Sequence, residues 1–448
     1  MSQVEPMAAI PRPLVDVTQL IDRSALSSLQ GLVIGVCAFT MFTNGYDLQV
    51  MALTVPSLAK EWALSPSRFG YGLTAANVGI VVAATFLAPW GDRVGRRPLL
   101  IAALVLGGVA TALTASATSP DQFVLWRFLT GLGVGMNIPN ANAWTSEYAP
   151  ARARATYLIL MNASIAAGSI MAGVIAPVIL DSFGWRGTFV IGGVAPLLTA
   201  VVIFFAAPES LKFLMARRPN DARVPAILER IAPDLDPATI RRPVAGSHPP
   251  NPSVWVLLGS RFRFRTLVLW TIMPLNLFTF YVLISWLPTL LQSAGWSIES
   301  AVRGSILIPT GGVIGGLALS FFLNRGMTRP TMVAAYLTSA VCLLLFKVIP
   351  SGPAWVAMLF IIGGGVSGSQ LALNALSTAY YPPAIKATGM SWVGVLGNLG
   401  SILAPLLGGW LIARGTAPID ILASLGVPAL ACAAIALSMR NEWQSDTA

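Results

Sequence analysis

An acidic side chain inside an apolar segment is the most informative residue of this chain. Asp47 closes the run Asn44-Gly45-Tyr46-Asp47, within an apolar stretch that covers about 29–55. An ionisable group inside a membrane span costs roughly 2.5–3.5 kcal/mol on insertion scales, so it marks a functional site by default. A carboxylate in hydrocarbon can accept and release a proton. Asp47 is therefore the first candidate for proton-coupled chemistry.

Arg127 is the basic residue that helix geometry places at a similar depth. Asp47 lies about 27 Å from the start of its helix, and Arg127 lies about 8 Å into a helix that enters from the other side near Gln122. With Arg127 close, Asp47 stays ionised; if Arg127 turns to another anion, Asp47 takes up a proton more readily. We expect Asp47 to be the proton acceptor and Arg127 to be a switch or an anion ligand. The alternative is a structural ion pair that locks two helices.

The composition indicates a polytopic membrane protein. Of 448 residues, 55% are hydrophobic and 10% are charged, the mean hydropathy is +0.72, and a soluble domain would carry about 25% charged residues. Three cysteines lie singly in apolar runs, and His248 lies in a Pro-rich polar loop, so we expect no metal site, disulfide framework or cofactor. No nucleophile with a neighbouring base is visible, which argues against an enzyme.

Apolar runs of about 20 residues, long enough to cross the hydrocarbon core, occur six times in 29–207 and six times in 264–440. We predict an all-α membrane protein with twelve transmembrane helices in two pseudo-symmetric six-helix bundles. The Pro- and Arg-rich interval 208–263 is expected to be a cytoplasmic linker. Residues 1–28 mix both signs of charge and lack a small-residue cleavage site, so they and 441–448 are expected to be cytoplasmic tails.

Positive charge predicts the orientation of the spans. Most of the 28 Lys and Arg residues fall in loops on the side of the N-terminus. The opposite side holds only Lys60, Arg68, Arg186, Arg303, Lys347 and Arg414. Because basic loops stay in the cytoplasm, both termini and the linker are predicted to be cytoplasmic. The net charge of +10 then reflects topology and does not indicate nucleic-acid binding.

Two loops at equivalent positions of the two halves are alike. Residues 92–98 read Asp-Arg-Val-Gly-Arg-Arg-Pro after the second span, and 324–330 read Asn-Arg-Gly-Met-Thr-Arg-Pro after the eighth. Repeated bundles imply alternating access, in which the two halves rock about a site near the bilayer midplane.

Several motifs resemble one transporter family. The loop 92–97 resembles the signature of the major facilitator superfamily, with Ala88 where that pattern usually has Gly. Four further segments resemble the aromatic acid:proton symporter family: 44–47, 127–133, Pro139-Asn140-Ala141 before Ser146-Glu147-Tyr148, and Pro208-Glu209-Ser210. The resemblance covers 29–440 apart from the linker.

The resemblance implies proton-driven uptake of an aromatic carboxylate into a bacterial cell. Hydroxybenzoates, protocatechuate or other lignin-derived acids are the expected substrates, and the expected location is the inner membrane, in which we expect a monomer. The family usually has Asp at the position of Asn44, so this chain lacks one potential proton site. The alternatives are a transporter of another organic anion, a proton-coupled antiporter, and a nutrient receptor of the same architecture.

Polar faces on apolar helices are candidates for the substrate cavity. Asn44 with Asp47, and Gln370 with Asn374, each share one helix face. Amides can bind ring hydroxyls or a carboxylate, and aromatic side chains can pack on a ring. The predicted substrate-binding residues are Asn44, Tyr46, Asn162, Tyr281, Gln370, Asn374 and Trp392. Interhelical hydrogen bonding and interfacial anchoring are the structural alternatives.

Charged residues on the cytoplasmic side form a second set. By resemblance to the family, they form an ion-pair latch that holds the outward-open state and breaks on switching. The predicted gating residues are Asp92, Arg93, Arg96, Arg97, Glu147 and Arg152. Glu209, at the end of the sixth span, is a further candidate for this latch.

Overall fold

The computed structural model describes residues 15–16, 21–22, 26–218, 221–231, 240–241, 253–382 and 385–439. These residues are mostly helical, with one two-residue parallel pairing between β1 (Val15–Asp16) and β2 (Ile240–Arg241). The predictions for most of the N-terminal tail, for the centre of the linker with His248 and for the tail 441–448 lie outside the described residues.

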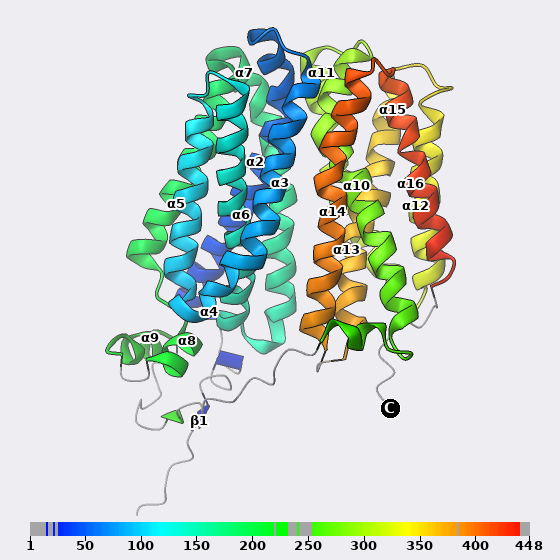
Figure 1. The fold of residues 1–448 in the computed structure, drawn as a ribbon. Coiled ribbons are helices and arrows are strands. Elements are labelled where there is room, and N and C mark those ends of the chain that lie inside the picture. Colours follow the sequence, from blue (N-terminus) through cyan, green and yellow to red (C-terminus); the bar gives the residue numbers. More distant parts are fainter. Residues whose placement is uncertain are drawn as a thin grey trace, which may run out of the picture.

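The first six spans form one bundle (Figure 1). The second span begins with η1 (Pro66–Phe69) and α3 (Gly70–Val82), and continues through η2 (Ala83–Leu87), η3 (Ala88–Trp90) and α4 (Gly91–Val94). The other spans are α2 (Ser28–Glu61), α5 (Arg96–Thr114), α6 (Pro120–Tyr148) and α7 (Arg154–Ala206).

Two spans lie within α7, and Gly184 separates them. Its φ of 64° and ψ of −172° interrupt the helix, and this conformation favours glycine because it has no Cβ. Residues on the two sides of Gly184 therefore belong to two neighbouring helices of the first bundle.

The last six spans form the second bundle, beside the first (Figure 1). They are α10 (Arg263–Ser293), α11 (Ile298–Leu323), α12 (Thr328–Leu345), α13 (Pro353–Tyr380), α14 (Lys386–Ala413), and α15 (Pro418–Ser424) with α16 (Gly426–Ala436). In the sequence between the two bundles, the chain forms α8 (Leu211–Arg217), α9 (Arg223–Ile231) and η6 (Val254–Leu258).

The predicted twelve-helix fold is confirmed. Ten helical segments of the described chain are long and apolar enough to cross a membrane. One of these segments contains the two spans of α7, and α6 adds the twelfth. Length and apolar content define such spans without any tertiary contact, which is why sequence alone predicts them.

The two bundles pack together through their apolar cores at the end of the molecule where α2 ends and α11 begins. The apolar cluster at this end combines residues of both bundles, whereas the clusters at the other end each belong to one bundle. Beside this contact, within the second bundle, the Trp286 indole donates to the Pro405 carbonyl at 3.2 Å. Two hydrogen bonds join α3 to α14: Asn77 Nδ2 donates to Ser401 O at 2.8 Å, and Thr74 Oγ1 to Ile402 O at 3.4 Å.

Close packing on α7 sets the rotation of α2 and hence the direction of Asp47. A Cβ at Gly45 would lie 1.8 Å from the Ile165 carbonyl oxygen, so only glycine permits this approach. Ser169 Oγ donates to the Gly45 carbonyl at 2.9 Å and holds the two helices in register. With Gly45 against α7, Asp47 faces α5 and α6.

Candidate functional site

Asp47 and Arg127 form a bidentate ion pair inside the first bundle. Arg127 Nη1 donates to Asp47 Oδ1 at 2.9 Å, and Nη2 donates to Oδ2 at 2.6 Å. Only 8% of Asp47 and 2% of Arg127 is exposed. Two parallel charge-assisted hydrogen bonds make this the strongest geometry for such a pair. The expected proximity of the two side chains is therefore present.

Two threonines and a phenylalanine complete the surroundings of the pair. Thr111 Oγ1 of α5 donates to Asp47 Oδ1 at 3.3 Å and lies 3.2 Å from Thr130 Oγ1 of α6. The Arg127 guanidinium lies 5.7 Å from the Phe189 ring centroid, within cation–π range. Sequence reasoning missed these residues, because threonine is common in apolar helices and nothing local marks its partner.

Tyr46 has a structural position beside the pair. Its hydroxyl donates to the Thr188 carbonyl at 3.1 Å, and only 5% of the residue is exposed. A Cβ at Gly192 would lie 3.0 Å from the Tyr46 ring, so the ring packs closely against α7. In this conformation Tyr46 joins helices of one bundle.

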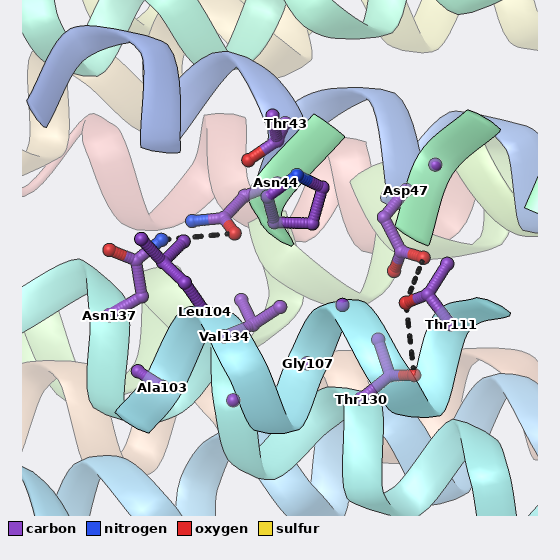
Figure 2. A pocket seen from close by; sticks show the side chains of 14 residues that line it. Thr43, Asn44, Asp47, Ala103, Leu104, Gly107, Thr111, Thr130, Val134 and Asn137 are labelled. Carbon is purple, nitrogen blue, oxygen red and sulfur yellow. Dashed lines mark hydrogen bonds between the residues drawn. The ribbon is translucent and has the colours of Figure 1, made fainter. Parts of the chain in front are cut away.

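A small cavity adjoins the ion pair between α2, α5, α6 and α7 (Figure 2). Its volume is about 20 Å³. One water molecule needs roughly 10–15 Å³ of such space, and an aromatic acid needs far more. The cavity is lined by Thr43, Asn44, Asp47, Ala103, Leu104, Gly107, Gly108, Thr111, Thr130, Gly133, Val134, Asn137, Gly192 and Pro196.

Asn44 lies at this cavity and pairs with an amide of α6. Asn137 Nδ2 donates to Asn44 Oδ1 at 3.2 Å. Of the predicted substrate-binding residues, Asn44 and Tyr46 thus lie close to the pair, and they lie inside the first bundle. Among the described residues, none of the other five forms a hydrogen bond with Asp47 or Arg127: Asn162, Tyr281, Gln370, Asn374 and Trp392.

The other predicted substrate residues are spread over several helices. Gln370 Oε1 accepts from Asn276 Nδ2 at 2.7 Å, which joins α10 to α13. Asn162 Nδ2 donates at 2.9 Å to Asn142, a residue that sequence reasoning did not select. Asn374 is exposed. Tyr281 lies edge-on to Phe280 with ring centroids 5.4 Å apart, and Trp392, 38% exposed, lies 6.2 Å from the Trp270 ring.

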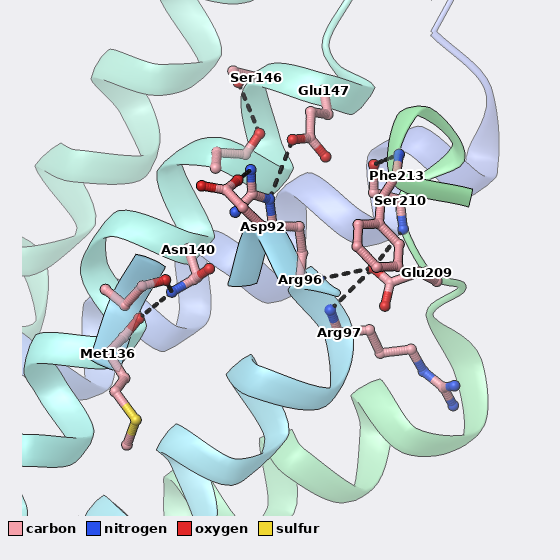
Figure 3. A network of polar contacts seen from close by, with 12 residues as sticks. Asp92, Arg96, Arg97, Met136, Asn140, Ser146, Glu147, Glu209, Ser210 and Phe213 are labelled. Carbon is pink, nitrogen blue, oxygen red and sulfur yellow. Dashed lines mark hydrogen bonds and ion pairs between the residues drawn. The ribbon is translucent and has the colours of Figure 1, made fainter. Parts of the chain in front are cut away.

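Four of the six predicted gating residues, Asp92, Arg96, Arg97 and Glu147, lie in a group of polar contacts at the end of the first bundle that carries α4 (Figure 3). Arg96 contacts Asp92 and also donates from Nε to Glu147 Oε1 at 3.2 Å. Arg97 donates to the Phe204 carbonyl oxygen, whereas Arg93 and Arg152 are exposed. The contacts of Arg96 and Arg97 stay within one bundle, and the role of these residues as a latch remains a prediction.

Glu209 connects the end of α7 to the start of α5. Its Oε1 accepts from the backbone N–H groups of Arg96 at 3.0 Å, Arg97 at 3.2 Å and Ser210 at 2.8 Å. The carboxylate therefore satisfies free donors at a helix N-terminus, where negative charge is favoured. Gly95, with φ of 116°, leaves space for it, because a Cβ there would lie 2.1 Å from Glu209 Oε2.

Glu209 is expected to make stability depend on pH. Burial raises the pKa of Glu209 above its ordinary value and outweighs the three backbone donors. Because the pKa of Glu209 is higher in the folded than in the unfolded protein, proton binding stabilises the folded state, fully so at pH values below the ordinary pKa of 4.5. This stabilisation is lost as the pH rises through the folded-state pKa. Glutamine does not titrate, so only the wild type loses this stabilisation. The melting temperature of Glu209→Gln relative to that of the wild type is therefore expected to increase as pH rises from 4.5. A difference that does not change with pH would contradict this.

Comparisons with known proteins identify the family. The Major Facilitator Superfamily profile matches residues 37–405 and, in an overlapping match, 309–445. The chain is 31% identical over 443 residues to the 4-hydroxybenzoate transporter PcaK of Acinetobacter baylyi, covering 97% of this chain and 96% of that protein. It is 30% identical to the gallate transporter of Pseudomonas putida, covering 94% of each.

The fold agrees with this assignment. The crystal structure of a D-xylose-proton symporter aligns with a TM-score of 0.70 at 19% identity and covers 93% of this chain and 100% of that one. Family and fold are those of transporters, and not of enzymes. The chain belongs to the major facilitator superfamily and, within it, to the aromatic acid transporter family.

Proposed function

We propose that this protein imports an aromatic carboxylate together with protons by alternating access. The observation that carries the proposal is the buried ion pair of Asp47 and Arg127, which lies inside a transporter fold. A hydroxybenzoate-like acid is the proposed substrate class. The relatives named 4-hydroxybenzoate, gallate and gentisate transporters support it.

The charge of the substrate favours a proton partner. Moving one negative charge inward against a membrane potential of roughly 100 mV costs about 2.3 kcal/mol. One proton carried with the anion cancels this cost, and a second proton makes the potential a driving force. Asp47 is the proposed carrier, because its carboxylate is buried and can be neutralised by a proton.

Arg127 acts in this proposal as the switch of the cycle. Its guanidinium is 2% exposed and the neighbouring cavity holds about 20 Å³, which favours the role of a switch over that of a direct ligand. When Asp47 is protonated, Arg127 loses its charged partner, and the contacts of α2 with α6 weaken. The substrate then binds elsewhere, and Asn162, Tyr281, Gln370, Asn374 and Trp392 are its proposed ligands.

The proposed setting is the inner membrane of a bacterium, with the protein as a monomer. Both termini and the linker are placed in the cytoplasm, because the loops on their side carry most of the Lys and Arg residues. In this orientation Asp92, Arg93, Arg96, Arg97, Glu147 and Arg152 face the cytoplasm, where they form the proposed latch.

Uptake into proteoliposomes with an alkaline interior tests the proposal. The acids to compare are 4-hydroxybenzoate, protocatechuate, gallate, gentisate and benzoate, with empty liposomes as the control for passive diffusion. We expect accumulation of at least one of these acids, with alkalinisation of the outer medium. Acidification of the medium would indicate an antiporter, uptake of non-aromatic anions alone would indicate another substrate class, and binding without flux would indicate a receptor.

A further inference from the structure

The cavity beside Asp47 has the size and the lining of a water site. Its volume of about 20 Å³ exceeds the roughly 10–15 Å³ that a cavity needs, on the same measure, to hold one water molecule. Figure 2 shows Asp47 and Thr111 on one side and Asn44 and Asn137 on the other, with Gly107 between them. A buried water is stable where about two to four polar groups can bond to it, and these side chains supply them.

Asn137 has a polar atom without a protein partner. Only 1% of this residue is exposed, and its Nδ2 donates to Asn44 Oδ1 at 3.2 Å and to Thr40 O at 3.5 Å. Its Oδ1 accepts from no donor of the described residues. An unpaired buried acceptor costs about 1–3 kcal/mol, and Asn137 is one of the residues that line the cavity, so a donor within reach of its oxygen stabilises this arrangement. A water molecule is the donor that fits the space.

Glycines create the space for this water. Gly133 of α6 cannot carry a side chain, because a Cβ there would lie 2.6 Å from Gly107 Cα. Gly107 of α5 differs, because its Cβ would meet Gly133 Cα at 3.5 Å and Thr130 O at 3.8 Å, which are ordinary contact distances. A methyl group at position 107 therefore fits between α5 and α6 and takes up room at the wall of the cavity.

We propose that this cavity binds one water molecule, which carries the proton from Asp47 toward the cytoplasm. The proposal rests on the proposed function. The O–H bond of the protonated Asp47 breaks, and the proton joins a lone pair of the water to form hydronium. A different proton then leaves to bulk water, so that a carboxylate and a neutral water remain. Asn44 lies three residues closer than Asp47 to the cytoplasmic start of α2, which gives the direction. Asn44, Asn137 and Thr111 are positioning residues.

Two fluxes of 4-hydroxybenzoate in proteoliposomes test this water site. Net uptake requires Asp47 to release its proton in each cycle, whereas exchange of labelled for unlabelled substrate leaves the proton bound. We expect Gly107→Ala to lower net uptake by at least about tenfold and to leave exchange within about twofold of the wild type. Gly107→Ser places a hydroxyl in the same space, which can relay a proton, so net uptake is expected to stay within about threefold of the wild type.

The controls separate the possible failures. Gly35→Ala is the matched control, since a Cβ there has no atom within 4 Å and Gly35 does not line this cavity. If Gly107→Ala does not fold, Asn137→Ala decides, because it removes the unpaired oxygen and should likewise lower net uptake alone. The proposal is overturned if the variant that folds, Gly107→Ala or Asn137→Ala, shows net uptake at the wild-type level, or if its net uptake and exchange fall equally. A wild type that ignores an imposed pH gradient instead overturns the proposed function.

Discussion

Asp47→Asn is expected to abolish accumulation of the substrate while exchange continues. An amide keeps the size and part of the hydrogen bonding of the carboxylate but cannot carry a proton through the cycle. Net uptake driven by a pH gradient should fall by about a hundredfold or more, as expected when a group essential for proton transfer is removed. Exchange should persist, because the variant resembles the protonated state of the wild type. The measurement is substrate uptake in proteoliposomes with and without the pH gradient.

An exposed acid supplies the matched control for this substitution. Asp181 of α7 is exposed and lies outside the cavity beside Asp47, so Asp181→Asn should accumulate substrate like the wild type. Uptake by Asp47→Asn that still responds to the pH gradient would remove Asp47 from the mechanism. The ion pair with Arg127 would then be a lock between α2 and α6.

Removing Arg127 alone is expected to cost more stability than removing both partners. Arg127→Met leaves the Asp47 carboxylate buried without its cation, and breaking a buried pair in this way destabilises by about 3–5 kcal/mol. Adding Asp47→Asn removes the uncompensated charge, so the double variant should recover most of the loss. Lowering the pH should also lessen the destabilisation of Arg127→Met, because a lone carboxylate can become neutral. The measurement is the unfolding free energy in detergent, combined in a double-mutant cycle.

A half-exposed ion pair between an arginine and a carboxylate is the control for Arg127. Arg186 Nη1 lies 2.7 Å from Glu61 Oε1, and the two side chains are 44% and 42% exposed. Solvent screens such pairs, so Arg186→Met is expected to change stability by about 1 kcal/mol or less. Equal losses for Arg127→Met and Arg186→Met would show that burial of the Asp47 pair has no energetic weight.

Both predictions concern Asp47 and Arg127, which helix geometry alone places at a similar depth in the membrane. The rise of 1.5 Å per residue gives the height of each side chain along its own span, and the cost of a charge in hydrocarbon requires a partner at that height. Helix geometry alone does not give the rotation of α2. Its contact with α7 at Gly45 decides that Asp47 faces Arg127 and Thr111, and it also decides that Tyr46 binds Thr188.

The sequence by itself determined the membrane class and the twelve spans, and it singled out Asp47 as a candidate, because apolar length and the cost of a buried charge are local properties. The tertiary structure alone decided which polar groups meet. Glu209 reaches the N-terminus of α5 from 113 residues away, and Thr111 joins Asp47 across 64 residues. The cavity beside Asp47 is likewise lined by glycines of three helices, α5, α6 and α7, which only the tertiary structure brings together. Such contacts depend on helix rotation and packing, which no periodicity within one span encodes.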